Sequence, residues 1–131
     1  MPGTTLAYQE IIDSVDESLK RLETPYIDLL QIHWPDRYVP LFGGLPYDLD
    51  LERDDVISFE EQLRAMQDLI KAGKVRYFGV SNETPYGLCT FAQLASKISL
   101  PKLVSVQNSY SLLNRCDIGE CAGNIFSDLH M

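Results

Sequence analysis

The sequence predicts an α/β domain in which parallel strands alternate with helices. Three stretches carry apolar residues at helical spacing, and a short apolar run follows each of them. The order is helix, strand, long loop, helix, strand, helix, strand. This alternation favours parallel pairing with the helices packed outside the sheet, and an antiparallel sheet explains it less simply.

The first helix is expected at residues 9–23, followed by a strand at residues 26–32. Four apolar side chains recur on one face of the helix: Ile11, Val15, Leu19 and Leu22. Thr24 and Pro25 mark the turn before the strand, and Pro35 limits its continuation. The strand is expected to be buried, because most of its residues are apolar: Ile27, Leu29, Leu30 and Ile32.

A long loop at residues 34–57 follows the first strand. It is rich in proline and glycine, and its second half is acidic. Structureless loops of this length are uncommon and are usually lids, binding loops or disordered segments. We interpret it as a partly ordered lid over the end of the first strand, and a flexible insertion explains the pattern equally well.

Ser58 opens the second helix, and Glu61 three residues later predicts a capping box. The buried face of this helix is expected to consist of four residues: Phe59, Leu63, Met66 and Ile70. Gly73 is expected to end the helix in a left-handed conformation. A second strand is predicted at residues 75–80.

The third helix is expected to start at Pro85, with Thr84 as its cap. Its predicted buried face again has four members: Leu88, Phe91, Ala95 and Ile98. Pro101 ends this helical pattern, and a third strand is expected at residues 103–106.

Each predicted strand ends in polar residues. His33 follows the first strand, Ser81 and Asn82 follow the second, and Gln107 and Asn108 follow the third. Because the carboxyl ends of parallel strands meet at one edge of a sheet, we expect a functional site there. A lone histidine is often structural, so both interpretations of His33 stay open on this pattern alone.

Acidic residues outnumber basic ones by 19 to 11, and the net charge of -8 argues against nucleic acids and anionic membranes as partners. No Gly-rich phosphate loop is present. No apolar run approaches the ~18 residues of a membrane span, and the first residues do not form a targeting signal, so a soluble protein is expected.

The chain contains three cysteines, at positions 89, 116 and 121, and no second Cys or His pair completes a zinc set. We interpret Cys89, Cys116 and Cys121 as reduced thiols and expect no metal site. The expected compartment is therefore the cytoplasm or another reducing one.

Three motifs resemble the aldo-keto reductases over approximately residues 8–116: Y-I-D-L-L-Q-I-H-W-P-D, A-G-K-V-R-Y-F-G-V-S-N and L-V-S-V-Q-N-S-Y-S-L-L-N-R. The long insertion after the first motif is similar to the Tas-like branch. The family fold is a (β/α)8 TIM barrel of ~250 residues. The resemblance therefore implies that residues 1–131 form a single partial barrel domain with three parallel βα units of the eight, barrel strands four to six. Residues 117–131 do not match and are expected to be a divergent tail.

The resemblance also implies a function, the NADP-dependent reduction of aldehyde or ketone carbonyls by hydride transfer. In the family a histidine at the place of His33 orients the substrate carbonyl, and residues at Ser81, Asn82 and Gln107 contact the nicotinamide amide. Trp34 is expected to line the substrate pocket. Tyr110 is expected to support the cofactor, although like Trp34 it could equally be structural.

Other family residues have no counterpart in these 131 residues. They are the catalytic tyrosine, lysine and aspartate, and the basic residues that hold the adenosine phosphate. We therefore expect no reductase activity from this chain alone, weak NADP binding, and self-association or aggregation, because three strands cannot close a barrel. The alternative is a non-catalytic binding or regulatory module.

Overall fold

A computed structural model describes residues 5–39, 48–109 and 111–113. Its sheet contains three parallel strands in the order β1-β2-β3. The strands are β1 (Ile27–Ile32), β2 (Val75–Ser81) and β3 (Ser105–Gln107). The helices are α1 (Tyr8–Leu22), α2 (Phe59–Lys71), α3 (Pro85–Lys97) and the short 3-10 helix η1 (Leu49–Leu51) in the long loop. This topology confirms the parallel α/β prediction.

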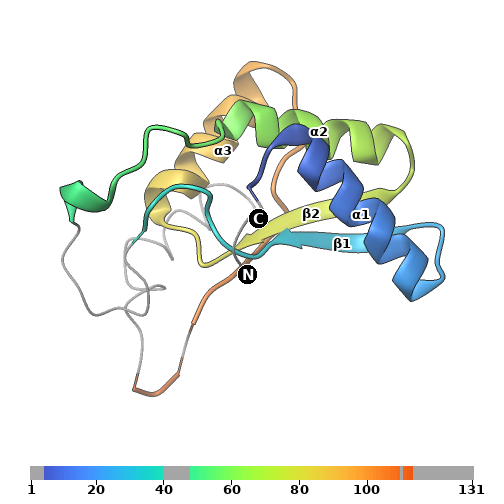
Figure 1. Cartoon of the computed structure of the whole chain (residues 1–131), viewed down its shortest axis with the longest axis horizontal. Helices are drawn as coiled ribbons and strands as arrows, with labels where there is room; N and C mark the ends of the chain where they lie inside the picture. Colours follow the sequence, from blue (N-terminus) through green and yellow to red (C-terminus); the bar gives the residue numbers. More distant parts are fainter. Residues whose placement is uncertain (1–4, 40–47, 110, 114–131) are drawn as a thin grey trace.

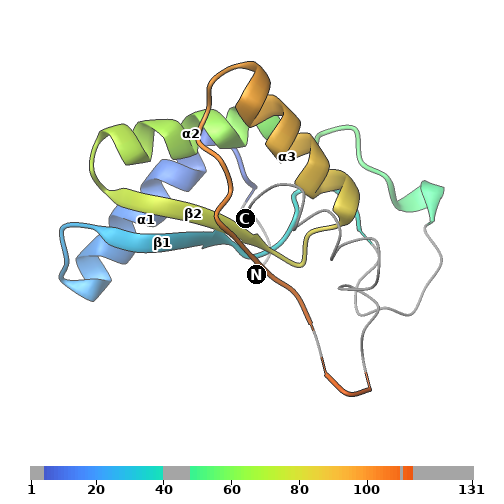
Figure 2. The same cartoon turned by 180° about the vertical axis from the view of Figure 1, so that it is seen from behind.

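The three α-helices lie on one side of the sheet, as the front and back views both show (Figures 1 and 2). The core lies between them and the strands. Phe78 and Val80 of β2 point into it and are each only 1% exposed. Helix α2 is central, because it contacts α1, α3 and β2. Its buried apolar residues are Leu63, Ala65, Met66 and Leu69.

The opposite face of the sheet is open to solvent. Leu29 of β1 and Tyr77 of β2 are neighbours in the strand register, and they are 42% and 58% exposed. The prediction that β1 is buried is therefore wrong for Leu29. Ile32 is buried at 7% exposure, because it faces the helices.

On the same open face, Ser105 of β3 lies very close to Gly79 of β2. Gln31 Nε2 donates to Ser105 Oγ at 3.4 Å, which links the strands on either side of β2. A Cβ at Gly79 would collide with the side chain and the main chain of Ser105. This position therefore requires glycine.

The predicted face of α1 is correct in its first turns, where Ile11 and Val15 are buried. The prediction is wrong for Leu22, which is 64% exposed. Helix α1 runs at an angle to α2, and its last turn points away from α2 (Figure 1), so α2 does not cover it. Glu23 follows in a left-handed conformation, with a φ of 52°, and ends the helix.

Helix α2 was predicted to begin with a capping box and to end at a left-handed glycine. Ser58 Oγ accepts a hydrogen bond from the Glu61 N–H at 3.1 Å, as expected. The second half of the capping box is wrong, because Glu61 Oε1 instead accepts from the Tyr8 N–H at 2.9 Å. The Glu61 carboxylate thus accepts a hydrogen bond from the first turn of α1 instead of from its own helix. Gly73 has a φ of 72°, which confirms the left-handed end of α2.

Helix α3 begins as predicted, with Thr84 Oγ1 accepting from the Gly87 N–H at 3.3 Å. Ile98 lies after the end of the helix and is 36% exposed, so its assignment to the buried face is wrong. The third strand begins at Ser105, later than expected. The chain already runs beside β2 at Val104, whose N–H donates to the Phe78 carbonyl at 3.0 Å.

Candidate functional site

Polar residues at the ends of β2 and β3 are joined by hydrogen bonds at the carboxyl edge of the sheet. Ser81 and Gln107, the last residues of these strands, are partners in the register. Ser81 Oγ donates to the Gln107 carbonyl oxygen at 2.7 Å, and the Asn82 N–H donates to the same oxygen at 3.0 Å. The Gln107 main chain therefore holds both residues of the Ser-Asn pair.

Asn82 also connects this pair to the end of β1. Its Nδ2 donates to the His33 carbonyl oxygen at 2.9 Å and to Ser81 Oγ at 3.2 Å. Asn82 has a φ of 55°, a left-handed conformation that asparagine tolerates better than most residues. The structure thus brings His33, Ser81, Asn82 and Gln107 to one edge.

The side chains at this edge differ in exposure. His33 and Gln107 are exposed, whereas Ser81 is buried at 5% exposure. The half-buried Trp34 lies beside His33, with 5.5 Å between the ring centroids and 36° between the ring planes. Two aromatic rings therefore lie side by side directly after β1. Tyr110 lies outside the described residues.

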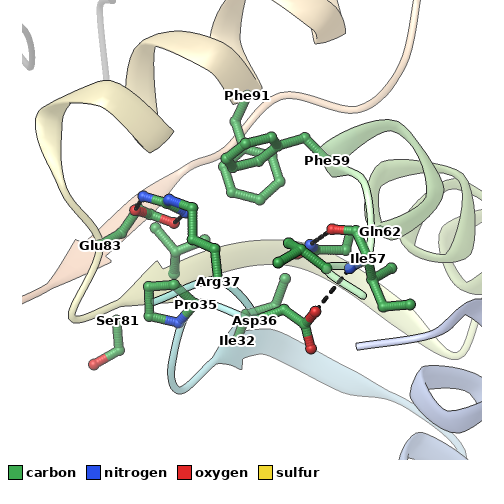
Figure 3. Close-up of a pocket in the computed structure, with 12 residues that line it drawn as sticks. Ile32, Pro35, Asp36, Arg37, Ile57, Phe59, Gln62, Ser81, Glu83 and Phe91 are labelled. Atoms are coloured by element: carbon green, nitrogen blue, oxygen red, sulfur yellow. Dashed lines mark hydrogen bonds and ion pairs between the residues drawn. The ribbon is translucent and has the colours of Figure 1, made fainter. Parts of the chain in front are cut away.

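The long loop is closed at its base by Asp36. Asp36 Oδ1 accepts from the Leu6 N–H at 3.1 Å, and Oδ2 accepts from the Ile57 N–H at 2.7 Å (Figure 3). The space beside this contact, between Asp36, Phe59 and Phe91, has a volume of only about 10 Å³. It has room for about one water, so it is part of the packed interior.

A buried ion pair that the sequence patterns did not predict lies next to Asn82. Glu83 is 4% exposed, and its Oε2 accepts from Arg37 Nη1 at 3.1 Å. Arg37 Nη2 bonds to the other carboxylate oxygen and to Thr84 Oγ1, the latter at 2.8 Å (Figure 3). The guanidinium also lies over the Phe59 ring, 5.1 Å from its centroid. Arg37 is therefore fixed by charge, hydrogen bonds and aromatic contact.

Asn108 pairs with the main chain of Glu83 from the other side. Its Oδ1 accepts from the Glu83 N–H at 3.2 Å, and its Nδ2 donates to the Glu83 carbonyl at 3.0 Å. In the sequence Asn108 is recognisable as a polar strand end, but its pattern indicates no particular role. An acidic residue directly before a helix cap was the only sequence signal for Glu83.

The described parts of the long loop lie beside the start of α3. An open hollow of about 580 Å³ separates them, lined by Arg37, Tyr38, Val39, Glu52, Arg53, Val56, Thr84 and Tyr86. Residues 40–47 lie outside the described residues, so the lid interpretation stays a prediction. At the far end of the loop, the hydrogen bond and charge of Arg53 lower the pKa of Asp55, and the same contact raises the pKa of Arg53.

Metal-binding groups do not assemble in the part of the chain that the structure describes, where no three His, Cys, Asp or Glu side chains come together. Cys89 is a free thiol on α3. Cys116 and Cys121 lie outside this part. Among the same described residues, no helix has the length and apolar character needed to cross a bilayer.

The parallel strands, the outer helices and the polar carboxyl edge together define a piece of an α/β barrel protein. The chain belongs to the aldo/keto reductase family, whose family model matches residues 1–121. This is a family of oxidoreductases, and the match confirms the resemblance read from the three motifs. The matched region ends within the predicted tail, so the tail boundary stays a prediction.

Two curated relatives show how much of a complete family member this chain represents. It is 44% identical to Protein tas of Escherichia coli K12 over 114 residues, which are 87% of this chain and 33% of that protein. It is also 44% identical to an aldo-keto reductase of Babesia bovis over 119 residues, which are 86% of this chain and 42% of that protein. The chain thus spans well under half the length of these relatives.

Solved structures give the same result for the fold. The thermostable aldo-keto reductase Tm1743, solved with the inhibitor epalrestat, superposes with a TM-score of 0.67 at 28% identity. The match covers 94% of this chain and 37% of that one. A putative 2,5-diketo-D-gluconic acid reductase B gives a TM-score of 0.64 at 28% identity, over 92% of this chain and 36% of that one. These barrel neighbours confirm the expected fold, a partial (β/α)8 barrel.

Proposed function

We propose that this chain supplies the nicotinamide-binding edge of an NADP-dependent aldo-keto reductase that reduces aldehyde or ketone carbonyls. The observation that carries the proposal is the linked set of Ser81, Asn82 and Gln107 at the carboxyl edge of the sheet. When bound, the cofactor supplies the hydride. The residues of this chain bind and orient the groups that react.

The chemistry of the set fits a nicotinamide carboxamide, which offers two donors and one acceptor. Ser81 Oγ already donates to Gln107, so toward a ligand it is an acceptor. Asn82 Nδ2 makes a shorter bond to His33 and a longer one to Ser81. The longer bond is the one that a ligand carbonyl can replace while Asn82 stays attached to His33. The exposed Gln107 amide adds both a donor and an acceptor.

The arginines described in the long loop are poorly suited to bind the phosphates of the cofactor. The two arginines described in the long loop are both paired with carboxylates, Arg37 with Glu83 and Arg53 with Asp55. The net charge of -8 also opposes a polyanion. We therefore propose that this chain holds NADP weakly and mainly through its nicotinamide.

His33 is proposed to orient the substrate carbonyl, and Trp34 to contact the substrate. The exposed imidazole can reach a molecule at the edge, because the bond from Asn82 holds the His33 main chain beside the Ser-Asn pair. The Trp34 ring lies against the imidazole and gives the same region an apolar surface. Both roles require that substrate and nicotinamide share this edge.

A non-catalytic binding or regulatory module is the second candidate, and the open face of the sheet favours it. Leu29 and Tyr77 present apolar surface there, where another copy of the chain or another protein can pack. The reducing compartment expected from the cysteines suits either candidate.

Nicotinamide binding is testable with NADP⁺ and saturation-transfer NMR, which detects weak ligands. We expect a dissociation constant on the order of millimolar, because neutral hydrogen bonds each contribute ~0.5–1.5 kcal/mol. By the same energies, Gln107→Ala should weaken binding by about 2- to 10-fold. Gln9→Ala, which removes an exposed amide on α1, is the matched control and should bind like the unaltered chain. A low-micromolar constant would refute weak binding, and an unaffected Gln107→Ala variant would refute the assignment.

A further inference from the structure

Glu83 is a buried carboxylate directly after Asn82, and its contacts come from two directions. Its side chain bonds to Arg37 of the long loop and to the Thr84 N–H, the latter at 2.6 Å. Its main-chain N–H and carbonyl both bond to the Asn108 side chain. The proposed nicotinamide contacts do not use this carboxylate.

A buried ion pair at this position contributes little net stability. Removing two charges from water costs several kcal/mol per ion, and apolar replacements of buried pairs are often neutral or stabilising. Such a pair instead fixes the relative orientation of the two segments that carry it, because a guanidinium and a carboxylate form two parallel hydrogen bonds. Arg37 and Glu83 make this two-point contact.

The two halves of the pair are close in sequence to two site residues. Arg37 lies four positions after His33, and Glu83 lies one position after Asn82. The bond from Asn82 to the His33 carbonyl and the ion pair are therefore two neighbouring links between the same two segments. A single link leaves a hinge, whereas two links fix the relative orientation of the segments.

The turn that carries Asn82 is also bonded along its main chain. The N–H groups of Asn82, Glu83 and Thr84 donate to the Gln107 carbonyl, the Asn108 side chain and the Glu83 side chain, respectively. We propose that Glu83 is a positioning residue, whose ion pair with Arg37 holds the loop after His33 against this turn and so directs the Asn82 carboxamide toward nicotinamide. The assignment rests on the proposed nicotinamide site.

The test uses Glu83→Gln, which keeps the shape of the side chain and removes its charge. The first measurement is hydrogen exchange at residues 82–84 without ligand, and the second is saturation transfer to the nicotinamide protons of NADP⁺. We expect faster exchange at residues 82–84 and nicotinamide binding weaker by about threefold or more, as for coupled groups in one network. Exchange in α2 should stay unchanged. Glu60→Gln is the matched control, because Glu60 pairs with Arg64 on the exposed surface of α2.

The single change leaves the half-buried Arg37 without a carboxylate, so that variant can fail to fold. Changing both Arg37 and Glu83 to Gln leaves no unpaired buried charge, and this double variant should fold with the same loss of nicotinamide contact. A double or single variant that folds and binds like the unaltered chain would overturn the assignment, and so would equal acceleration of exchange in α2. Absence of nicotinamide contact in the unaltered chain would instead overturn the proposed function itself.

Discussion

Purified chain incubated with NADPH and a broad panel of aldehydes and ketones is expected to show no steady consumption of NADPH. The resemblance to the aldo-keto reductases implies that a tyrosine donates the proton to the substrate, and no motif of the kind expected to carry that tyrosine occurs in these 131 residues. A positioned general acid is typically worth about 10²–10⁴ in rate. We expect no such donor beside His33, so carbonyl reduction should stay at the uncatalysed level.

The measurement is the absorbance of NADPH over hours at high protein concentration. Two variants make it decisive: His33→Ala and His130→Ala, which removes the other histidine of the chain. Steady consumption that His33→Ala abolishes and His130→Ala preserves would contradict the prediction. It would show that this chain reduces carbonyls and requires His33 to do so.

The second large effect is self-association through the open face of the sheet. Parallel sheets are normally covered on both faces, and here the helices cover one. A few hundred Å² of exposed apolar surface corresponds to on the order of 10 kcal/mol, comparable to the whole stability of a domain. We therefore expect sedimentation velocity to detect dimers or larger assemblies at micromolar concentrations.

The residues that carry this effect can be tested by substitution. Changing Leu29 and Tyr77 to Gln should shift the population toward monomer, because it removes apolar surface from the open face. The matched control changes Leu49 and Leu51 to Gln, since these leucines of η1 are 73% and 53% exposed but lie in the loop. A monomeric, cooperatively unfolding chain, or an equal effect of the control, would refute the prediction.

The elements of this fold could be predicted from the sequence because their signals are local. Residues 58–61 start α2 and Gly73 ends it, and each of these signals acts within one helical turn. The spacing of apolar residues along α1 and α3 placed Leu22 and Ile98 on the buried faces, but both side chains are exposed. Periodicity shows which side chains share a face, and whether another element covers that face depends on distant parts of the chain.

In the candidate site too, some residues could be predicted from local sequence and others could not. His33, Ser81 and Asn82 could be selected from the sequence, since parallel topology alone brings strand ends to one edge. Arg37 and Glu83 are 46 positions apart, and nothing in either local sequence specifies the other as its partner. Side-chain links between loops depend on the folded path of the chain, which composition and spacing do not encode.

The hydrogen bonds of the Asp36 carboxylate allow the long loop to vary in length and sequence. Its bond to the Ile57 N–H joins the start of the long loop to its end, and its bond to the Leu6 N–H attaches this junction to the segment before α1. Doubling the length of a flexible loop costs only ~0.6 kcal/mol in closure entropy. Insertions or deletions between residues 40 and 47 should therefore leave the carboxyl edge in place. The loop can therefore change in sequence and length while the ends of the strands keep their positions.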